Sequence, residues 1–204
     1  MASYANRPKI NLSKYFTVGL GLGLVFVAGV ILFRLFRDPV KQELNYLTWS
    51  KTTQSSLTPP NTDFALTIDK IGASSAIIAS VNPYDSAVYQ LALRSGIAHA
   101  QGTSVPGQGA NIFLFAHSSA DLLTAERYNS VFYLIHHLEP GDTIKVWHED
   151  KEYRYAVAEK HLVTPDNTQY LTQTGLVETL TLMTCWPPGT TYKRLLITAH
   201  LVSD

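Results

Sequence analysis

Cysteine is almost absent from this 204-residue sequence, and its scarcity excludes several kinds of site. Cys185 is the only thiol, so the chain can form neither an intrachain disulfide nor a metal centre built from several thiolates. Net charge is also lacking, because 16 basic and 16 acidic residues cancel. A chain without excess positive charge has no general attraction for nucleic acid, so we expect no nucleic acid partner.

Charge is missing, too, from one long segment near the amino terminus. Residues 15–33 carry no charged side chain and are bracketed by Lys14 and Arg34. At about 1.5 Å per residue, a helix of this length matches a hydrocarbon layer of about 30 Å. A cleaved signal peptide is the less favoured interpretation, because its apolar core would be shorter. We therefore expect a transmembrane anchor over residues 15–36. Basic residues flank it equally on both sides, so charge alone does not fix its orientation.

Residues 37–63 separate this anchor from the rest of the chain. Asp38 and Pro39 form a typical helix start, and the helix is expected to run to about Trp49. Residues 50–63 are rich in Ser and Thr and contain a proline pair, which indicates a spacer. The segment 37–63 is thus interpreted as a helix and a linker.

From Phe64 onward the sequence is dominated by short apolar runs bounded by turn residues. Such runs predict strands. The predicted strands are 64–68, 75–81, 111–116, 143–147, 152–163, 178–185 and 193–201, and the predicted helices are 85–94 and 129–137. This pattern favours an all-β domain, a closed or nearly closed antiparallel barrel with short peripheral helices.

The only thiol ends one of these predicted strands. Cys185 closes the run from Thr181 and precedes a Trp-Pro-Pro-Gly turn that cannot continue a strand. The sulfur is therefore expected at a barrel rim, where a nucleophile is both held and accessible. A free thiol has a pKa near about 8.5, so such a nucleophile needs cationic neighbours.

Two other side chains are expected at the same rim. Arg194 begins the strand after Cys185, and an antiparallel hairpin would return it toward the sulfur, where a guanidinium can stabilise an oxyanion. A solvated strand-end charge, like that of Lys193, is the plainer interpretation. His117 follows the apolar strand 111–116, and imidazole is the usual proton-transfer partner of a cysteine. His99, before the glycine-rich stretch 102–111, is its main competitor.

These motifs together resemble the sortase family. The family shares a Thr-Leu-x-Thr-Cys strand end, found here at 181–185, an Arg on the next strand, matched by Arg194, and a His after a hydrophobic strand, matched by His117. The segments 96–111 and 132–157 are similar to the family's glycine-rich motif and its Pro-Gly-Asp hairpin. The resemblance covers about residues 62–202.

The resemblance implies an eight-stranded sortase-type barrel at 64–204 that acts as a cysteine transpeptidase. Cys185 would attack a peptide bond, His117 would transfer protons, and Arg194 would steady the transition state. His99, Thr184 and Trp186 would support the site or bind substrate.

The resemblance also implies partners and a location. The substrates would be secreted proteins with a carboxyl-terminal sorting motif, and the acceptor an amine such as a cell-wall precursor or a pilin lysine. The catalytic domain would be extracytoplasmic, on a single-pass membrane protein with a cytoplasmic tail at 1–14. No cofactor or site metal is expected; some relatives bind calcium, but no acidic cluster indicates it here. A housekeeping role is favoured, because no second hydrophobic span or obvious lid is seen.

Several further functions are compatible with the sequence. A cysteine peptidase would resolve the thioester with water, and sequence does not report acceptor preference. An L,D-transpeptidase would show a Ser-His-Gly-Cys motif, which is absent. The sequence is also compatible with two other functions, a pilin-polymerising sortase and a non-catalytic, membrane-tethered binding barrel.

Overall fold

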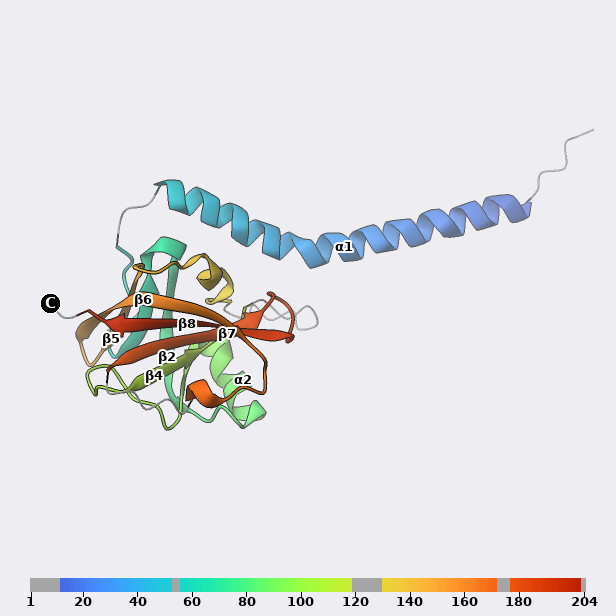
Figure 1. Ribbon diagram of the computed structural model, residues 1–204. Coiled ribbons are helices and arrows are strands. Elements are labelled where there is room, and N and C mark those ends of the chain that lie inside the picture. The colour runs from blue at the N-terminus through green and yellow to red at the C-terminus, as the bar shows by residue number, and fades with distance from the viewer. Residues whose placement is uncertain (1–11, 53–55, 119–129, 172–176, 203–204) are drawn as a thin grey trace, which may run out of the picture. The chain divides into compact units, whose positions relative to one another are not determined.

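The computed structural model describes residues 12–52, 56–118, 130–171 and 177–202. The chain divides into two compact units, residues 1–41 and 42–204, which are described separately. The helix α1 (Leu12–Thr52) runs from the first unit into the second, and the strands all belong to the second (Figure 1).

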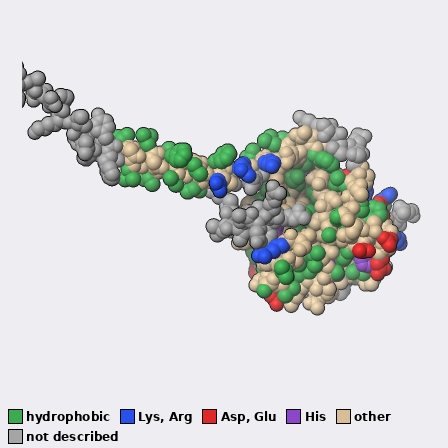
Figure 2. Space-filling model, turned by 180° about the vertical axis from the view of Figure 1, so that it is seen from behind, with side chains coloured by type: hydrophobic (Ala, Val, Ile, Leu, Met, Phe, Trp, Pro, Cys, Tyr) green, Lys and Arg blue, Asp and Glu red, His purple; other side chains and the backbone are tan. Residues whose placement is uncertain are grey.

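The part of α1 in the first unit is apolar and exposed. Every side chain described between residues 18 and 34 is exposed, and hydrophobic groups cover this part of the helix in Figure 2. Among the residues that the structure describes, however, no helix has an apolar stretch long enough to cross a membrane. The transmembrane anchor predicted at 15–36 is therefore not supported by the structure.

The second unit is built on eight strands that close into a barrel. Their order around the barrel is β1-β2-β3-β4-β7-β8-β6-β5. Figure 1 shows β6, β8 and β7 running side by side. The strands are β1 (Phe64–Ile68), β2 (Ala73–Val81), β3 (Ile97–Ala100), β4 (Asn111–Phe115), β5 (Thr143–His148), β6 (Lys151–Val163), β7 (Thr179–Trp186) and β8 (Lys193–Leu201). The closed eight-stranded barrel expected from the sequence is confirmed.

Short helices lie between the strands. They are η1 (Asp69–Ile71), α2 (Ser86–Ser95), η2 (Tyr133–His137) and η3 (Gln169–Leu171). The helix expected at 85–94 is present as α2, and its cap is Asp85, whose carboxylate accepts hydrogen bonds from two backbone N–H groups of the first turn. Of the helix expected at 129–137, residues 133–137 form the short 3-10 helix η2, residues 130–132 are not helical, and residue 129 lies outside the described residues.

The sequence prediction was wrong in two details of the barrel. The sheet is not wholly antiparallel, because β3 pairs with β2 and β7 pairs with β4 in parallel. The helix α2 lies between β2 and β3 in the chain and provides the crossover that a parallel pair needs. The strand β3 was missed, since its four residues are all buried and show no polar alternation.

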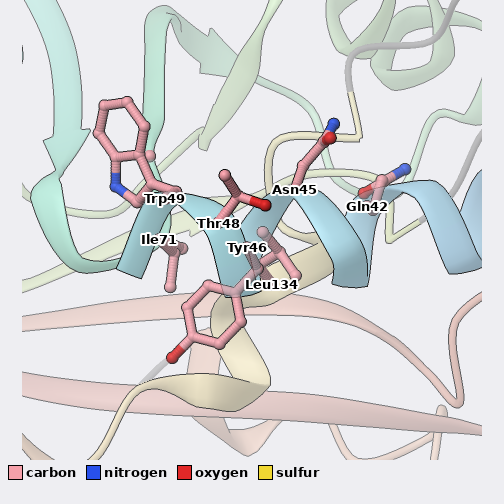
Figure 3. Close-up of a pocket in the computed structure, with 8 residues that line it drawn as sticks. Gln42, Asn45, Tyr46, Thr48, Trp49, Ile71 and Leu134 are labelled. Atoms are coloured by element: carbon pink, nitrogen blue, oxygen red, sulfur yellow. The ribbon is translucent and has the colours of Figure 1, made fainter. Parts of the chain in front are cut away.

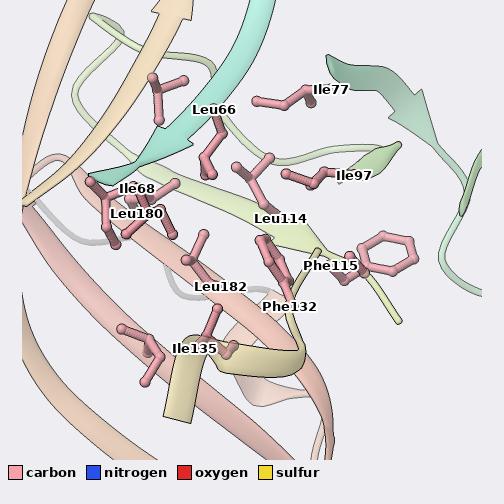
Figure 4. Packing of buried hydrophobic residues seen from close by; sticks show 14 of the residues in the cluster. Leu66, Ile68, Ile77, Ile97, Leu114, Phe115, Phe132, Ile135, Leu180 and Leu182 are labelled. Atoms are coloured by element: carbon pink, nitrogen blue, oxygen red, sulfur yellow. The ribbon is translucent and has the colours of Figure 1, made fainter. Parts of the chain in front are cut away.

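The barrel interior is filled by branched aliphatic side chains. Leu66 of β1, Leu114 of β4 and Leu182 of β7 are fully buried and point into the same space (Figure 4). Phe132 and Ile135, at the start of η2 and within it, are also fully buried and pack against them. Each such side chain contributes about 1.5–3 kcal/mol by leaving water, so this core holds the strand ends in place.

The glycine-rich segment fastens the start of β7. Glu178, one residue before β7, is buried, and its carboxylate accepts hydrogen bonds from the backbone N–H groups of Gly107 (3.0 Å) and Gly109 (2.9 Å). The Tyr155 hydroxyl donates a third, at 2.6 Å. Gly107 has a φ of +86°, a conformation that favours glycine. This end of β7 is opposite to the end that carries Cys185, so the motif has a structural role.

Within the second unit, the last turns of α1 pack on the barrel. The Trp49 indole donates to the Asp69 carbonyl oxygen at 2.8 Å, and the backbone N–H of Leu57 donates to the Asp69 carboxylate at 2.8 Å. Tyr46 and Trp49 extend from this helix toward a cavity of about 510 Å3, which Ile71 also lines (Figure 3). The sequence predicted that this helix ends at about Trp49 and that residues 50–63 form a spacer. In the structure α1 continues to Thr52, and Leu57 of the predicted spacer is bonded to the barrel.

Candidate active site

The hairpin of β7 and β8 brings Cys185 and Arg194 together. Cys185 lies directly opposite Arg194 in the antiparallel register, one pair before the hairpin loop. The loop folds back on itself, because the backbone N–H of Thr190 donates to the Pro187 carbonyl oxygen at 3.0 Å. Cys185 is half-buried, so its sulfur is held by the strand and remains accessible.

The parallel pair of β4 and β7 brings His117 to the same place. Phe115 is the partner of Met183, and the pairing continues beyond it, since the backbone N–H of Ala116 donates to the Met183 carbonyl oxygen at 3.2 Å. The Thr184 hydroxyl then donates to the Ala116 carbonyl oxygen at 2.9 Å. His117 is the next residue, so it directly follows the segment that is bonded to Met183 and Thr184, the two residues before Cys185.

One cavity joins these residues. It has a volume of about 600 Å3, and Cys185, His117, Arg194 and Thr184 all line it. Its wall also includes five aromatic residues, which are Tyr84, Tyr89, Phe113, Phe115 and Tyr170. A concave site with an apolar wall and a few convergent polar groups is typical of a binding site for a small molecule or a peptide side chain.

The Arg194 guanidinium is oriented by the hairpin loop. Its Nη1 donates to the carbonyl oxygens of Thr191 at 3.2 Å and Lys193 at 3.3 Å. A guanidinium carries five N–H donors in a rigid plane and stays charged at all ordinary pH values. Arg194 can therefore present a fixed positive charge to an oxygen bound near Cys185.

His99 is buried outside this cavity. Its Nε2 donates to the Ser104 carbonyl oxygen at 2.8 Å, and its Nδ1 accepts from the backbone N–H of Ser80 at 3.4 Å. Burial lowers the pKa of His99 below its usual range, which favours the neutral ring. His99 is not among the lining residues, and its bonds join β2 to the loop after β3. In the structure His99 therefore bonds within the fold and not at the wall of this cavity.

Trp186 also lies outside the cavity. Its half-buried indole packs beside His136, with the ring centroids 5.1 Å apart. Unlike its neighbours Thr184 and Cys185, Trp186 is not among the residues that line the cavity. The structure therefore brings Cys185, His117, Arg194 and Thr184 together and leaves His99 and Trp186 apart from them.

The aromatic wall of the cavity was not identified from the sequence. Tyr84 precedes α2, Tyr89 lies within it, and Tyr170 belongs to η3, far from Cys185 along the chain. No spacing rule relates these segments to the β7–β8 hairpin. In the structure Asn111 links this wall to β7, because its amide donates to the Tyr170 carbonyl oxygen at 2.9 Å and its side-chain oxygen accepts from the Thr181 hydroxyl at 2.8 Å.

Side chains of the kinds that bind metals gather away from this cavity. Among the described residues, the group with suitable geometry is Glu43, His136 and His137. None of the three lines the cavity around Cys185. The site at Cys185 is thus a thiol, an imidazole and a guanidinium.

Known proteins share this fold. The sortase-domain family model matches residues 66–202. A lid mutant of sortase A from Corynebacterium diphtheriae is similar with a TM-score of 0.58, at 22% identity over 79% of each chain. Sortase C-1 from Actinomyces oris has a TM-score of 0.59 at 23% identity and covers 81% of this chain and 99% of its own. A pilus-related sortase C of Group B Streptococcus has a TM-score of 0.58 at 21% identity, with coverage of 82% and 90%.

No curated protein matches the chain. The likeness to the solved structures shows the fold, and the family match extends over well more than half of the chain, from β1 to the end of β8. On these grounds the chain belongs to the sortase family of cysteine transpeptidases.

Proposed function

We propose that this sortase cleaves a sorting motif near the carboxyl end of secreted proteins and transfers the acyl group to an amine of the cell envelope. The observation that carries the proposal is the pairing of Cys185 with Arg194 on the wall of a cavity that His117 also lines. These three groups supply the nucleophile, the positive charge and the proton carrier that acyl transfer requires.

The first half of the reaction forms a thioester. The Cys185 thiolate attacks the scissile carbonyl carbon, and the oxygen gains a negative charge that Arg194 stabilises. Protonated His117 gives its proton to the leaving amine as the carbon–nitrogen bond breaks. The carboxyl-terminal fragment leaves, and the acyl group stays on the sulfur.

The second half resolves the thioester. An incoming amine attacks the thioester carbon while neutral His117 takes its proton, and the Cys185 thiolate leaves as the new amide forms. Arg194 again stabilises the oxyanion. Sulfur, imidazole and guanidinium supply every group that these steps use, so the proposal includes no cofactor.

The acceptor is proposed to be a cell-wall precursor amine in a housekeeping role. Similar structures include both a sortase A and a pilus-related sortase C, so a pilin lysine is the second candidate acceptor. Deletion of the gene distinguishes them: loss of a housekeeping enzyme releases several client proteins from the envelope, whereas loss of a pilin polymerase abolishes one polymer ladder.

A membrane location belongs to the same proposal. Its support is the uncharged run of residues 15–33 in the sequence. In this proposal residues 1–14 lie in the cytoplasm and the catalytic domain lies outside the cell. Protease added to intact cells whose outer wall has been removed should degrade the catalytic domain and spare an epitope placed in residues 1–14. Protection of both segments would contradict this orientation.

The reaction itself is tested with synthetic peptides taken from the carboxyl-terminal regions of secreted proteins of the same organism. Incubation with hydroxylamine should give the hydroxamate of the amino-terminal fragment, and incubation without an amine should give the acid, as product masses will show. Cys185→Ala should form neither. An enzyme that yields only the acid, even with excess amine, would be a peptidase.

A further inference from the structure

A second cluster of reactive side chains joins the last turns of α1 to η2 outside the catalytic cavity. Glu43 of α1 faces two adjacent histidines of η2, His136 and His137. The Nε2 atom of His136 lies 3.4 Å from one carboxylate oxygen of Glu43, and the Nε2 atom of His137 lies 3.0 Å from the other. All three side chains are partly buried and lie within the second unit of the chain.

A hydrogen bond on the far side of the ring directs His136 toward Glu43. Its Nδ1 atom lies 2.9 Å from the Tyr133 carbonyl oxygen, which can only accept, so Nδ1 carries the hydrogen of this bond. Nε2 is then the ring nitrogen that faces the Glu43 carboxylate, and it is the atom with which His136 can bind a metal ion.

The distances suit a tetrahedral ion. Bonds of about 2.0–2.1 Å from zinc to nitrogen and oxygen set neighbouring ligand atoms about 3.3 Å apart. The two contacts to Glu43, at 3.4 and 3.0 Å, lie close to this value, and the donor atoms of all three residues lie within 4.8 Å of one another. Small side-chain rotations would bring the three atoms onto one ion.

We propose that Glu43, His136 and His137 form a binding site for a divalent transition metal ion, with zinc as the preferred ion. Two imidazoles and one carboxylate suit zinc and its first-row neighbours, whereas calcium and magnesium prefer all-oxygen sites. A water molecule would complete the coordination. This site shares no residue with the catalytic cavity and does not depend on the proposed transpeptidation.

The surroundings of the cluster fit this role. The bond from His136 Nδ1 to the Tyr133 carbonyl is the outer bond that commonly orients a metal-binding histidine. The Tyr46 ring stacks on His137 with centroids 4.0 Å apart and fixes the plane of that imidazole. Lys160, the nearby cation, bonds to the His136 carbonyl oxygen at 2.8 Å and to Glu139 at 3.1 Å, so its charge is balanced.

The ion would clamp the last turns of α1 to the barrel near the active-site rim. Glu43 lies in α1, and the two histidines lie in η2, more than 90 residues away in the chain. His136 also contacts Trp186, the residue after Cys185. Metal binding would therefore stiffen the wall behind the β7–β8 hairpin and hold this part of α1 in place.

Cobalt provides the direct test, since tetrahedral Co2+ absorbs strongly in the visible range. The full chain, purified without a polyhistidine tag, is titrated with Co2+ and then with Zn2+ as competitor. We expect one Co2+ per chain, visible bands that zinc removes, and a rise in melting temperature with zinc. His137→Ala and Glu43→Gln should each weaken binding at least tenfold. Cys185→Ala should keep the bands, which excludes the thiol as a ligand.

His161→Ala is the matched control. His161 also pairs with a carboxylate, Glu159 at 2.7 Å, but it belongs to no three-residue cluster among the described residues. It should bind Co2+ as the unchanged protein does. The proposal fails if Co2+ gives no visible bands, if the bands vanish with Cys185→Ala, or if His161→Ala weakens binding as much as His137→Ala. Folding of each variant is checked by its melting temperature without metal, and Glu43→Gln serves if His137→Ala does not fold.

Discussion

The Thr184 hydroxyl donates a 2.9 Å hydrogen bond to the carbonyl oxygen of Ala116, and both groups are buried. This bond joins the strand end that carries Cys185 to the segment that carries His117. Thr184→Val removes the hydroxyl and leaves a buried carbonyl without this donor, which costs about 1–3 kcal/mol of stability. Because a displacement of about 1 Å can cost about 100-fold in rate, we also expect kcat/KM to fall at least tenfold.

Thr184→Ser is the matched control, since it keeps the hydroxyl. It should retain kcat/KM within about threefold of the unchanged protein, while Thr184→Val should lose mainly kcat. Equal losses in the two variants would mean that the methyl group of Thr184, and not its hydrogen bond, holds the site.

The charge of Arg194 can be tested against that of its neighbour. Arg194→Met removes the cation that lies opposite Cys185, and the loss of one oxyanion donor typically lowers kcat by about 100- to 1,000-fold. Lys193→Met removes a charge one residue away that does not line the cavity, so its effect should stay within about twofold. Steady-state kinetics on one peptide measures both. Similar losses in both variants would show that net charge at the hairpin matters and that the Arg194 position does not.

The sequence predicted the parts of the site that depend on short-range geometry. The nine-residue spacing from Cys185 to Arg194 fits a hairpin, and the structure has this pairing. Strong apolar runs predicted seven of the eight strands, because burial and β propensity agree in them. The resemblance to the sortase family added the fold, which the family match confirms.

The remaining features depend on contacts between distant segments. The parallel pairing of β4 with β7 joins residues nearly 70 positions apart, and no local signal specifies such a partner. The pairing of Glu43 with His137 is longer still. Trp186 shows the same limit: it follows Cys185 in the sequence, but its indole packs beside His136, a residue about 50 positions earlier in the chain.

His99 should make stability depend on pH. Burial lowers its pKa in the folded protein, so the unfolded chain, with a histidine pKa near about 6.5, binds a proton first as the pH falls. Its stabilising contribution is therefore present above about pH 6.5 and is lost as the pH falls toward the folded-state pKa. Urea unfolding at pH 7.5 and 5.0 should show a smaller acid loss for His99→Gln than for the unchanged protein.

His161→Gln is the control for this measurement, because it removes a histidine whose side chain is 43% exposed and leaves the buried His99 in place. An acid loss that is the same in His99→Gln and the unchanged protein would show that burial does not lower the pKa of His99.

Two glycines with the same backbone angle allow steric contact to be measured alone. Gly107 and Gly102 both have a φ of +86°. A Cβ at Gly107 would lie 2.8 Å from the Tyr153 hydroxyl, whereas a Cβ at Gly102 would meet nothing within 4 Å. Gly102→Ala should cost about 1 kcal/mol from backbone strain. Gly107→Ala should cost about 1–3 kcal/mol more, because overpacking adds to the strain.

Chemical unfolding measures this difference, and Tyr153→Phe checks its cause. If the hydroxyl is the obstacle, Gly107→Ala should cost less in the Tyr153→Phe background than in the unchanged protein. The same cost in both backgrounds would assign the loss to the hydrogen bond from Gly107 to Glu178 instead.

Tyr155 should set the alkaline limit of stability. It is fully buried, and burial together with its 2.6 Å hydrogen bond to Glu178 raises its pKa far above the ordinary value. The unfolded chain loses the tyrosine proton near about pH 10, while the folded chain keeps it. The folded state then binds more protons than the unfolded state, so this group lowers the free energy of unfolding by about 1.4 kcal/mol for each pH unit above 10.

Tyr155→Phe removes this titration but also removes one donor to the buried Glu178 carboxylate. The variant should therefore be less stable than the unchanged protein at pH 8, by about 1–3 kcal/mol, and should lose less stability between about pH 9.5 and 11. Urea unfolding across this range gives both quantities from one set of curves. Tyr192→Phe is the control, because it removes the hydroxyl of an exposed tyrosine and leaves Tyr155 in place. If Tyr155→Phe and Tyr192→Phe show the same alkaline slope, the bond to Glu178 does not hold the Tyr155 proton.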